Sequence, residues 1–386
     1  MYTYSGFATN GDYIWYVGER NQIIQVDIQN GIMSYLGMVP GMFNRVYAYR
    51  TLVYLDDVIY LIPYYASQLC AYHLTTHKFE FIEFPADLFL DSEINRSFIG
   101  AKIVENDLVL YGLLSIVVIF NVRNRNFKSY RIDMEEAKNY GIDSVNFWRD
   151  GLEINGTLLI PLDYSNCAYK IDLLHNTANL IQMGEYYIRM PFQMMKRTGR
   201  FIYRITSNED WKIQIFVIDE KFPEKQIELC NFQVEHDWIP ENGQVPFLYG
   251  EIMDERLFLI PAYQDKTYIV DLKNGKVDSF IGETVKNKQI TLKSNSIIRN
   301  YFSGICVNQS TFATIHSACK KLVLIHGNQP YENSINLTME DGFYLKYNKD
   351  IFDFIINTNV SMDEQDGYSL VDYLQCVKDK KVDEDK

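Results

Sequence analysis

Short apolar segments alternate with polar turns along most of this chain, and one arrangement of the two recurs. An apolar strand ending in Ile-Pro, a polar turn and a second strand occur in LIPYYASQLCAYHLTTHKFEFI, LIPLDYSNCAYKIDLLHNTANLI and LIPAYQDKTYIVDLKNGKVDSF. The first strands of these copies end at Pro63, Pro161 and Pro261, which are roughly 100 residues apart. This even spacing indicates an internal repeat. If the repeat were half as long, further copies would lie between these three.

Degenerate copies of the same arrangement lie between and around these three. DLVLYGLLSIVVIFNVRNRNFKSYRI and RFIYRITSNEDWKIQIFVIDEKFPEKQIEL lie between them, and DYIWYVGERNQIIQVDIQNGIMSYLG and TFATIHSACKKLVLIHGNQPYENSINL flank the set. The seven copies recur every 45 to 55 residues or so, roughly the repeat length of propeller blades and not of helical solenoids.

An apolar strand also precedes most of the copies. Five copies keep a phenylalanine ten positions before the start of the quoted strand: Phe98, Phe147, Phe192, Phe247 and Phe302. The first and second copies have no phenylalanine at this register. Each unit is therefore predicted to contain four short strands, separated by polar or glycine-containing turns such as Gln29-Asn30-Gly31.

The strands are apolar on both faces, as in YIWYV, VIYLI and RLFLI. A single sheet cannot bury both faces alone, whereas sheets stacked radially in a closed ring bury each face against a neighbour and leave only short edges. The 29 tyrosines and 23 phenylalanines are typical of strand-rich proteins. The sequence therefore predicts an all-β fold, a seven-bladed β-propeller of four-stranded antiparallel blades, with six or eight blades as the neighbouring counts.

The predicted propeller spans residues 1–340, with blades at approximately 1–40, 41–90, 91–140, 141–185, 186–235, 236–290 and 291–340. Residues 341–386 are predicted to form a C-terminal cap or tail. Within it, residues 342–352 are expected to add a strand or a cap, and residues 369–378 have the apolar spacing of a terminal helix. No segment that would latch the two ends of the ring is evident.

The net charge of −13 and the pI near 5.0 argue against binding to nucleic acid or to an anionic membrane, because both require a basic surface. The N-terminus does not resemble a signal peptide, and no apolar stretch is long enough to span a bilayer. Six scattered cysteines without a CxxC pair suit a reducing compartment. The simplest prediction is a cytoplasmic protein, although a chain whose leader had been removed would look the same.

The phrase NGDYIWYV…NQIIQVDIQNG resembles bacterial β-propeller repeats of the broad kelch, NHL and virginiamycin-lyase-like group. The resemblance concerns the repeat format over residues 3–337. The paired glycines of kelch repeats and the Trp-Asp signature of WD repeats are both missing. The resemblance therefore implies a propeller, and it carries over no catalytic residue.

Motifs that would indicate a metal, a cofactor or a nucleophile are missing from the sequence. The six histidines show no HxH or HExxH spacing, and neither a phosphate-binding glycine loop nor GxSxG occurs. His316 and His326 end two successive strands of the last unit, and a shared place at one rim would allow a metal or acid–base role. Cys70 and Cys167 occupy equivalent repeat positions and are interpreted as packing residues. We therefore predict no metal site and no cofactor.

Candidate ligand-binding residues come from the strand that opens each unit. In propellers of this format the first strand of each blade lines the central channel, an expectation that rests on fold analogy. Arginine and lysine there would bind an anion, and aromatic rings would stack on sugars or flat rings. Alternatively, the charges face water or pair with Asp150 and Glu251. The candidates are Tyr4, Tyr49, Arg50, Lys102, Trp148, Arg149, Asp150, Lys196, Tyr249 and Glu251.

Two classes of function follow from this list. The first is a binding or scaffold propeller that presents one face or its channel mouth to a protein, a glycan or a small anionic ligand. The second is a propeller lyase, isomerase or hydrolase acting on a small anionic substrate near Arg50 and Arg149, with a carboxylate or histidine beside them. A tyrosine group could add an exposed aromatic surface or could simply pack, and it comprises Tyr64, Tyr65, Tyr186 and Tyr187. Whether the protein is an enzyme, and its oligomeric state, stay open at this point.

Overall fold

The computed structural model describes residues 6–18, 20–43, 45–89, 97–142, 147, 151–162, 165, 167–183, 192–207, 211–234, 246–261, 266–281, 301–316, 320–329 and 331–358. The chain divides into two compact units, Met1–Glu340 and Asp341–Lys386. The first unit contains all of the described sheets, and in the second the structure describes one helix, α3 (Phe343–Thr358). Within the described ranges, no helix is both long enough and apolar enough to cross a membrane.

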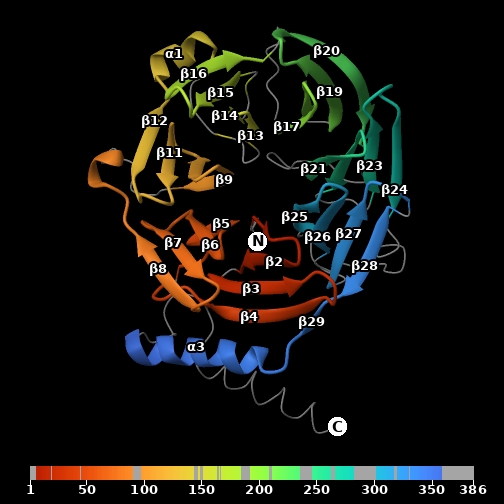
Figure 1. Ribbon diagram of the computed structural model, residues 1–386. Helices are drawn as coiled ribbons and strands as arrows, with labels where there is room; N and C mark the ends of the chain where they lie inside the picture. Colours follow the sequence, from red (N-terminus) through yellow and green to blue (C-terminus); the bar gives the residue numbers. More distant parts are fainter. Residues whose placement is uncertain are drawn as a thin grey trace. The chain divides into compact units, whose positions relative to one another are not determined.

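The first unit is a seven-bladed β-propeller. Each blade is a sheet whose four strands follow one another in chain order and pair antiparallel. Figure 1 shows the blades arranged in a ring, with the labelled first strands of the second to seventh blades nearest the centre. The predicted fold class and the predicted count of seven blades are confirmed.

Blade by blade, the strands are β1 (Ala8–Thr9), β2 (Tyr13–Val17), β3 (Gln22–Asp27) and β4 (Ile32–Met38); β5 (Tyr49–Leu55), β6 (Val58–Pro63), β7 (Leu69–His73) and β8 (Lys78–Ile82); β9 (Phe98–Val104), β10 (Asp107–Gly112), β11 (Ile116–Asn121) and β12 (Phe127–Arg131); β13 (Leu152–Ile154), β14 (Thr157–Pro161), β15 (Cys167–Asp172) and β16 (Thr177–Gln182); β17 (Phe192–Thr198), β18 (Phe201–Ser207), β19 (Lys212–Asp219) and β20 (Phe222–Gln233); β21 (Phe247–Met253), β22 (Arg256–Pro261), β23 (Lys266–Asp271) and β24 (Val277–Ile281); β25 (Tyr301–Asn308), β26 (Thr311–His316), β27 (Lys321–His326) and β28 (Glu332–Asn336). A short 3₁₀ helix, η1 (Ala86–Leu88), precedes the third blade, and α1 (Met134–Asn139) precedes the fourth.

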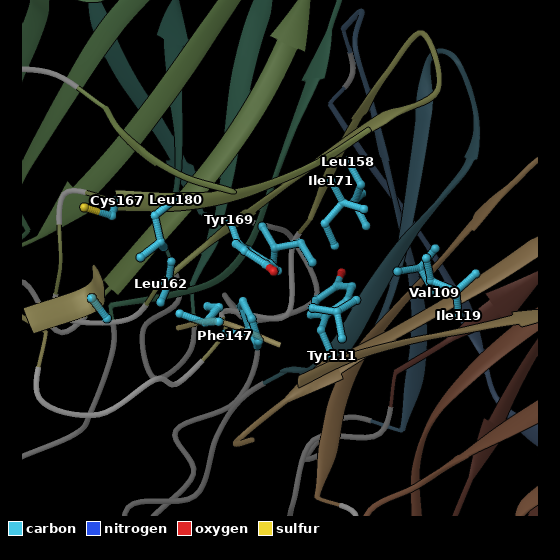
Figure 2. Close-up of a cluster of buried hydrophobic side chains, with 14 of the residues drawn as sticks. Val109, Tyr111, Ile119, Phe147, Leu158, Leu162, Cys167, Tyr169, Ile171 and Leu180 are labelled. Atoms are coloured by element: carbon cyan, nitrogen blue, oxygen red, sulfur yellow. The ribbon is translucent and has the colours of Figure 1, made fainter. Parts of the chain in front are cut away.

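Seven hydrophobic clusters hold the ring together, one between each pair of neighbouring blades. Successive residues of a strand point to opposite faces of its sheet. In β10, Leu108 and Leu110 therefore belong to the cluster shared with the second blade, whereas Val109 and Tyr111 belong to the cluster shared with the fourth. Figure 2 shows the latter cluster. Burying one such side chain completely contributes about 1.5–3 kcal/mol.

One backbone hydrogen bond recurs in every blade. The residue that follows the third strand donates its N–H to a carbonyl in the turn between the first two strands, over 2.9–3.1 Å. The seven pairs are Ile28 and Asp12, Leu74 and Asp57, Val122 and Asn106, Leu173 and Gly156, Glu220 and Arg200, Leu272 and Glu255, and Gly327 and Ser310. These turns lie at one end of the blades, here called the hairpin end; the other end is called the loop end.

An aspartate or asparagine ends the third strand in five of the blades, and its carboxylate or amide oxygen accepts backbone N–H groups of the turn that follows. The residues are Asp27, Asn121, Asp172, Asp219 and Asp271. At Asp27, partial burial acts to raise the pKa, but hydrogen bonds from Asn30 and Gln29 outweigh it and hold the pKa below its ordinary value. The Asp-Leu and Asn-Gly steps of the repeat are thus turn-forming groups.

A parallel strand after the seventh blade closes the ring. The strand β29 (Thr338–Met339) pairs with β4, where Thr338 donates to the carbonyl of Gly31 over 3.0 Å and Glu340 donates to that of Met33 over 2.9 Å. This latch is not evident in the sequence. Residues 342–352, for which a strand or a cap is expected, are helical in α3 apart from Gly342. The helix predicted at residues 369–378 lies outside the described residues.

Alanine substitution at Gly31 tests this closure. A Cβ at Gly31 would lie 2.5 Å from the carbonyl oxygen of Asn336 in β28, whereas a Cβ at Gly41 meets nothing within 4 Å. Both glycines have left-handed backbones, with φ of +70° and +71°. We expect Gly41→Ala to lower the free energy of unfolding by about 1 kcal/mol, and Gly31→Ala to lower it by at least about 1 kcal/mol more. Urea unfolding measures both, and equal losses would contradict the close approach of the last blade to the first.

Candidate functional site

A cavity of about 350 Å³ lies among the inner strands of the propeller. Its walls come from the chain at and before β1 and from β5, β9, β17, β21 and β25, together with Phe312 of β26. These inner strands belong to six of the seven blades, and they lie around the centre of the ring in Figure 1. The cavity therefore lies in the central channel, and its volume is at the lower end of the range for small-molecule sites.

Four of the ten candidate residues line this cavity: Lys102 of β9, Lys196 of β17, and Tyr249 and Glu251 of β21. They come from three different blades, so that only the closed ring brings them together. The cavity also contains polar side chains that the sequence analysis did not select: Thr9, Thr51, Tyr54 and Cys306. Thr51 and Tyr54 lie in β5, the strand from which Tyr49 and Arg50 were selected, two and five positions after Tyr49.

The three charged residues of the cavity occupy one level of the ring. Each pairs with the third residue of the second strand in its own blade, and an equivalent residue exists in every blade. The residues at this level are Ala8, Val53, Lys102, Leu152, Lys196, Glu251 and Ile305. The four apolar members all pack into the cluster shared with the next blade. A charged residue at this level therefore replaces an apolar contact at the innermost point between two blades.

Lys196 and Glu251 form an ion pair across the junction of the fifth and sixth blades. The Nζ–Oε2 distance is 3.2 Å, and the side chains are 11% and 26% exposed. The other carboxylate oxygen of Glu251, Oε1, accepts the N–H of Ile252 over 3.2 Å. In the sequence, two roles are open for the charged candidates: they bind a ligand, or they pair with acidic residues of the channel. Lys196 does pair with Glu251. Because both side chains are mostly withdrawn from water, removing one partner would leave the other charge poorly solvated.

Tyr49 is not part of the cavity. It is fully buried in the cluster between the first and second blades, and its N–H donates to Oδ1 of Asn21 over 3.1 Å. Tyr49 pairs with Pro63 as Phe247 pairs with Pro261, so it fills the phenylalanine register of the second blade. Burial raises the pKa of its hydroxyl far above the ordinary value. A tyrosine in this register packs as phenylalanine does, and it is therefore removed from the candidate set.

Arg50 lies at the loop end of the second blade and is absent from the described cavity lining. Its guanidinium carbon lies 3.9 Å from the ring centroid of Tyr64, whose ring packs against that of Tyr65. Six further residues of the sequence analysis lie outside the described part of the chain: Tyr4, Trp148, Arg149, Asp150, Tyr186 and Tyr187. Their proposed roles stay predictions.

The expectation that His316 and His326 share one rim is wrong. They end β26 and β27, which are antiparallel, so His316 pairs with Lys321 and His326 pairs with Thr311 at the opposite end of the hairpin. His326 contacts the Thr311 hydroxyl over 3.2 Å, and His316 is buried. Successive strands are antiparallel, so one ends at the loop end of the blade and the next ends at the hairpin end. Among the described residues, no group of three or more histidine, cysteine or acidic side chains could hold a metal ion.

The sequence matches no protein-family model, and no curated protein matches it. The structure is similar to that of KlHsv2 with loop 6CD replaced by a Gly-Ser linker, with a TM-score of 0.54 and 9% identity over 87% of this chain and 99% of that one. It is also similar to BamB from Moraxella catarrhalis (TM-score 0.48, 8% identity, 81% of this chain and 79% of that one). A third similar structure is the WD40 domain of Toxoplasma gondii coronin (TM-score 0.48, 10% identity, 73% and 71%).

At such low identity, the likeness to KlHsv2 shows the β-propeller fold alone. The kelch, NHL or virginiamycin-lyase-like subgroup and the bacterial origin remain predictions from the sequence.

A double-mutant cycle tests the ion pair in the channel wall. We expect Lys196→Met and Glu251→Met each to lower the free energy of unfolding by about 1–3 kcal/mol, because each removes the ion-pair partner of a charge that is mostly withdrawn from water. The variant with both changes should recover most of this loss, since four other blades hold apolar residues at the same level. Urea unfolding of the four proteins gives the coupling energy. Strictly additive losses would contradict the pairing.

Proposed function

We propose that this protein is a binding propeller that holds a small anionic ligand in its channel cavity. The observation that carries the proposal is the convergence of Lys102 with the Lys196–Glu251 pair at one level of the ring. The described lining thus contains two ammonium groups and one carboxylate, in a chain whose net charge is −13. A cavity with a net positive charge attracts an anion through the nearby ammonium groups, even though the protein as a whole is negatively charged.

The neutral groups of the cavity favour a ligand with hydroxyl groups as well as a carboxylate or phosphate. Thr9, Thr51, Tyr54 and Tyr249 place hydroxyl-bearing side chains in the wall. The hydroxyls of the first three donate to protein oxygens, so they would act as acceptors toward a ligand hydroxyl. Glu251 accepts hydrogen bonds only, so a ligand hydroxyl beside it would act as donor. Lys102 is a residue that we expect to contact the anionic group, because it is one of the two lysines in the described lining.

Binding is better supported than catalysis. The enzyme hypothesis requires a carboxylate or histidine beside arginines in a deep pocket. In the described lining, the carboxylate of Glu251 is held by Lys196. Arg50 is not among the lining residues and stacks on Tyr64 at the loop end. β-Propellers also commonly act as scaffolds for protein interactions. A reducing, cytoplasmic location is part of the same proposal, supported by the free thiols of Cys70, Cys167, Cys230 and Cys306.

A thermal-shift screen with citrate, malate, gluconate and inorganic phosphate tests the channel site. A ligand present at one hundred times its Kd stabilises the folded protein by about 2.7 kcal/mol. We expect at least one of these anions to raise the Tm of the wild type, and we expect Lys102→Met to abolish the shift, because the ammonium group that faces the anion is gone.

The matched control is Lys78→Met, which changes an exposed lysine of the outer strand β8. It should retain the full shift in Tm. An anion that stabilises Lys102→Met as strongly as the wild type would contradict the assignment of Lys102, and a panel without any effect on the wild type would contradict the channel site itself.

A further inference from the structure

A second cluster of cationic and aromatic side chains lies at the loop end of the second blade, apart from the channel cavity. It is formed by Arg45, Tyr47 and Arg50, from the end of the β4–β5 connection and the start of β5, and by Tyr64 and Tyr65, which follow β6. We call this group the arginine–tyrosine surface. Arg45 and Tyr65 are exposed, and Tyr47, Arg50 and Tyr64 are partly exposed. None of the five lines the cavity described above.

Buried hydrogen bonds hold the backbone beneath this surface in place. Asn21 is fully buried, and its Nδ2 donates to the carbonyls of Met42 over 2.8 Å and Arg45 over 2.6 Å, while its Oδ1 accepts from Tyr49. The carbonyl of Ala48 accepts the N–H groups of three successive residues, 64 to 66, over 2.8–3.1 Å. The two segments of the surface are therefore tied to each other and to the core before any partner arrives. Such preorganisation lowers the cost of binding.

The side chains themselves are also ordered by mutual contacts. The guanidinium carbon of Arg50 lies 3.9 Å from the ring centroid of Tyr64 and 5.8 Å from that of Tyr47. The rings of Tyr64 and Tyr65 meet edge to face, with centroids 4.3 Å apart. Tyr65 remains 47% exposed. Tyrosine and arginine are the residue types that dominate binding energy at protein interfaces, where their rigid or planar groups lose little freedom on binding.

The chemistry of the surface distinguishes between kinds of partner. Arg50 covers one face of Tyr64, so that this face is not open for stacking on a sugar. The net charge of −13 opposes a long polyanion such as nucleic acid and opposes an anionic membrane. A short acidic peptide carries its charge on a few neighbouring residues. Salt screens its repulsion from the more distant acidic groups of this protein, whereas its attraction to the nearby arginines is screened less. Arginine forks bind carboxylates in bidentate geometry.

We propose that the arginine–tyrosine surface binds an acidic peptide segment of a partner protein, with Arg45 and Arg50 on the carboxylates and Tyr65 packed beside them. The proposal is independent of the ligand proposed for the channel, because the two sites share no residue. It adds a protein partner to the functions of this propeller.

Fluorescence anisotropy with a fluorescein-labelled hexaglutamate peptide tests the proposal on the full chain. The wild type should bind hexaglutamate, more weakly as salt rises, and should not bind hexalysine. The variant Arg45→Gln with Arg50→Gln should bind hexaglutamate at least tenfold more weakly, because both carboxylate forks are lost. Arg123→Gln is the matched control: it removes an exposed arginine in the turn after β11, at the hairpin end, and should bind like the wild type.

The single variant Arg45→Gln controls for misfolding, because Arg45 is exposed and its replacement should leave the Tm unchanged. We expect it to bind hexaglutamate at least threefold more weakly than the wild type. Lys102→Met should bind the peptide normally, so that failure of the channel site and failure of this surface are distinguishable. Three results would overturn the proposal: no binding of hexaglutamate by the wild type at millimolar concentration, undiminished binding by the double arginine variant, or equally tight binding of a ten-residue oligothymidylate, which would indicate a general anion surface.

Discussion

Apolar side chains on both faces of every blade are the constraint on which this molecule depends. Each sheet is stable only between two others, so the seven inter-blade clusters must form a closed circuit that includes the contact of the seventh blade with the first. The parallel strand β29 lies at that last contact and ties the end of the propeller to β4. The cavity depends on the closed ring, because its lining residues Lys102, Lys196 and Glu251 come from three different blades.

The innermost level of the ring shows how a propeller can acquire a binding site at limited cost. At this level four blades hold apolar residues, and three hold charged ones. The Lys196–Glu251 pair keeps contact between its two blades while presenting charge to the channel. The arginine–tyrosine surface follows a different principle, because its side chains lie on connections whose shape is set by buried Asn21 and the carbonyl of Ala48.

The sequence predicted those features that repeat. The fold, the blade count and four residues of the cavity lining could be predicted from three repeating features. These are the phenylalanine register, the period of the copies and the strands that are apolar on both faces. Features that occur once were missed. Tyr49 takes the place of a phenylalanine, so a search for phenylalanine alone left it among the ligand candidates. The latch is only two residues long and has no pattern of its own. The stacking of Arg50 on Tyr64 depends on a turn folded over Ala48, which no spacing reveals.

The hydrogen bond that recurs at the hairpin end has a consequence for how this chain can diversify. Every blade ties its first and third strands together there through short turns, several of which require left-handed backbone at residues such as Asp57, Asn155 and Glu255. An inserted residue would break the tie and change the register of a whole blade. Loops that connect one blade to the next, by contrast, generally tolerate inserted length. Grafted peptides or new recognition loops are therefore better placed at the end that carries Arg50, because the turns of the hairpin end are constrained by the recurring bond.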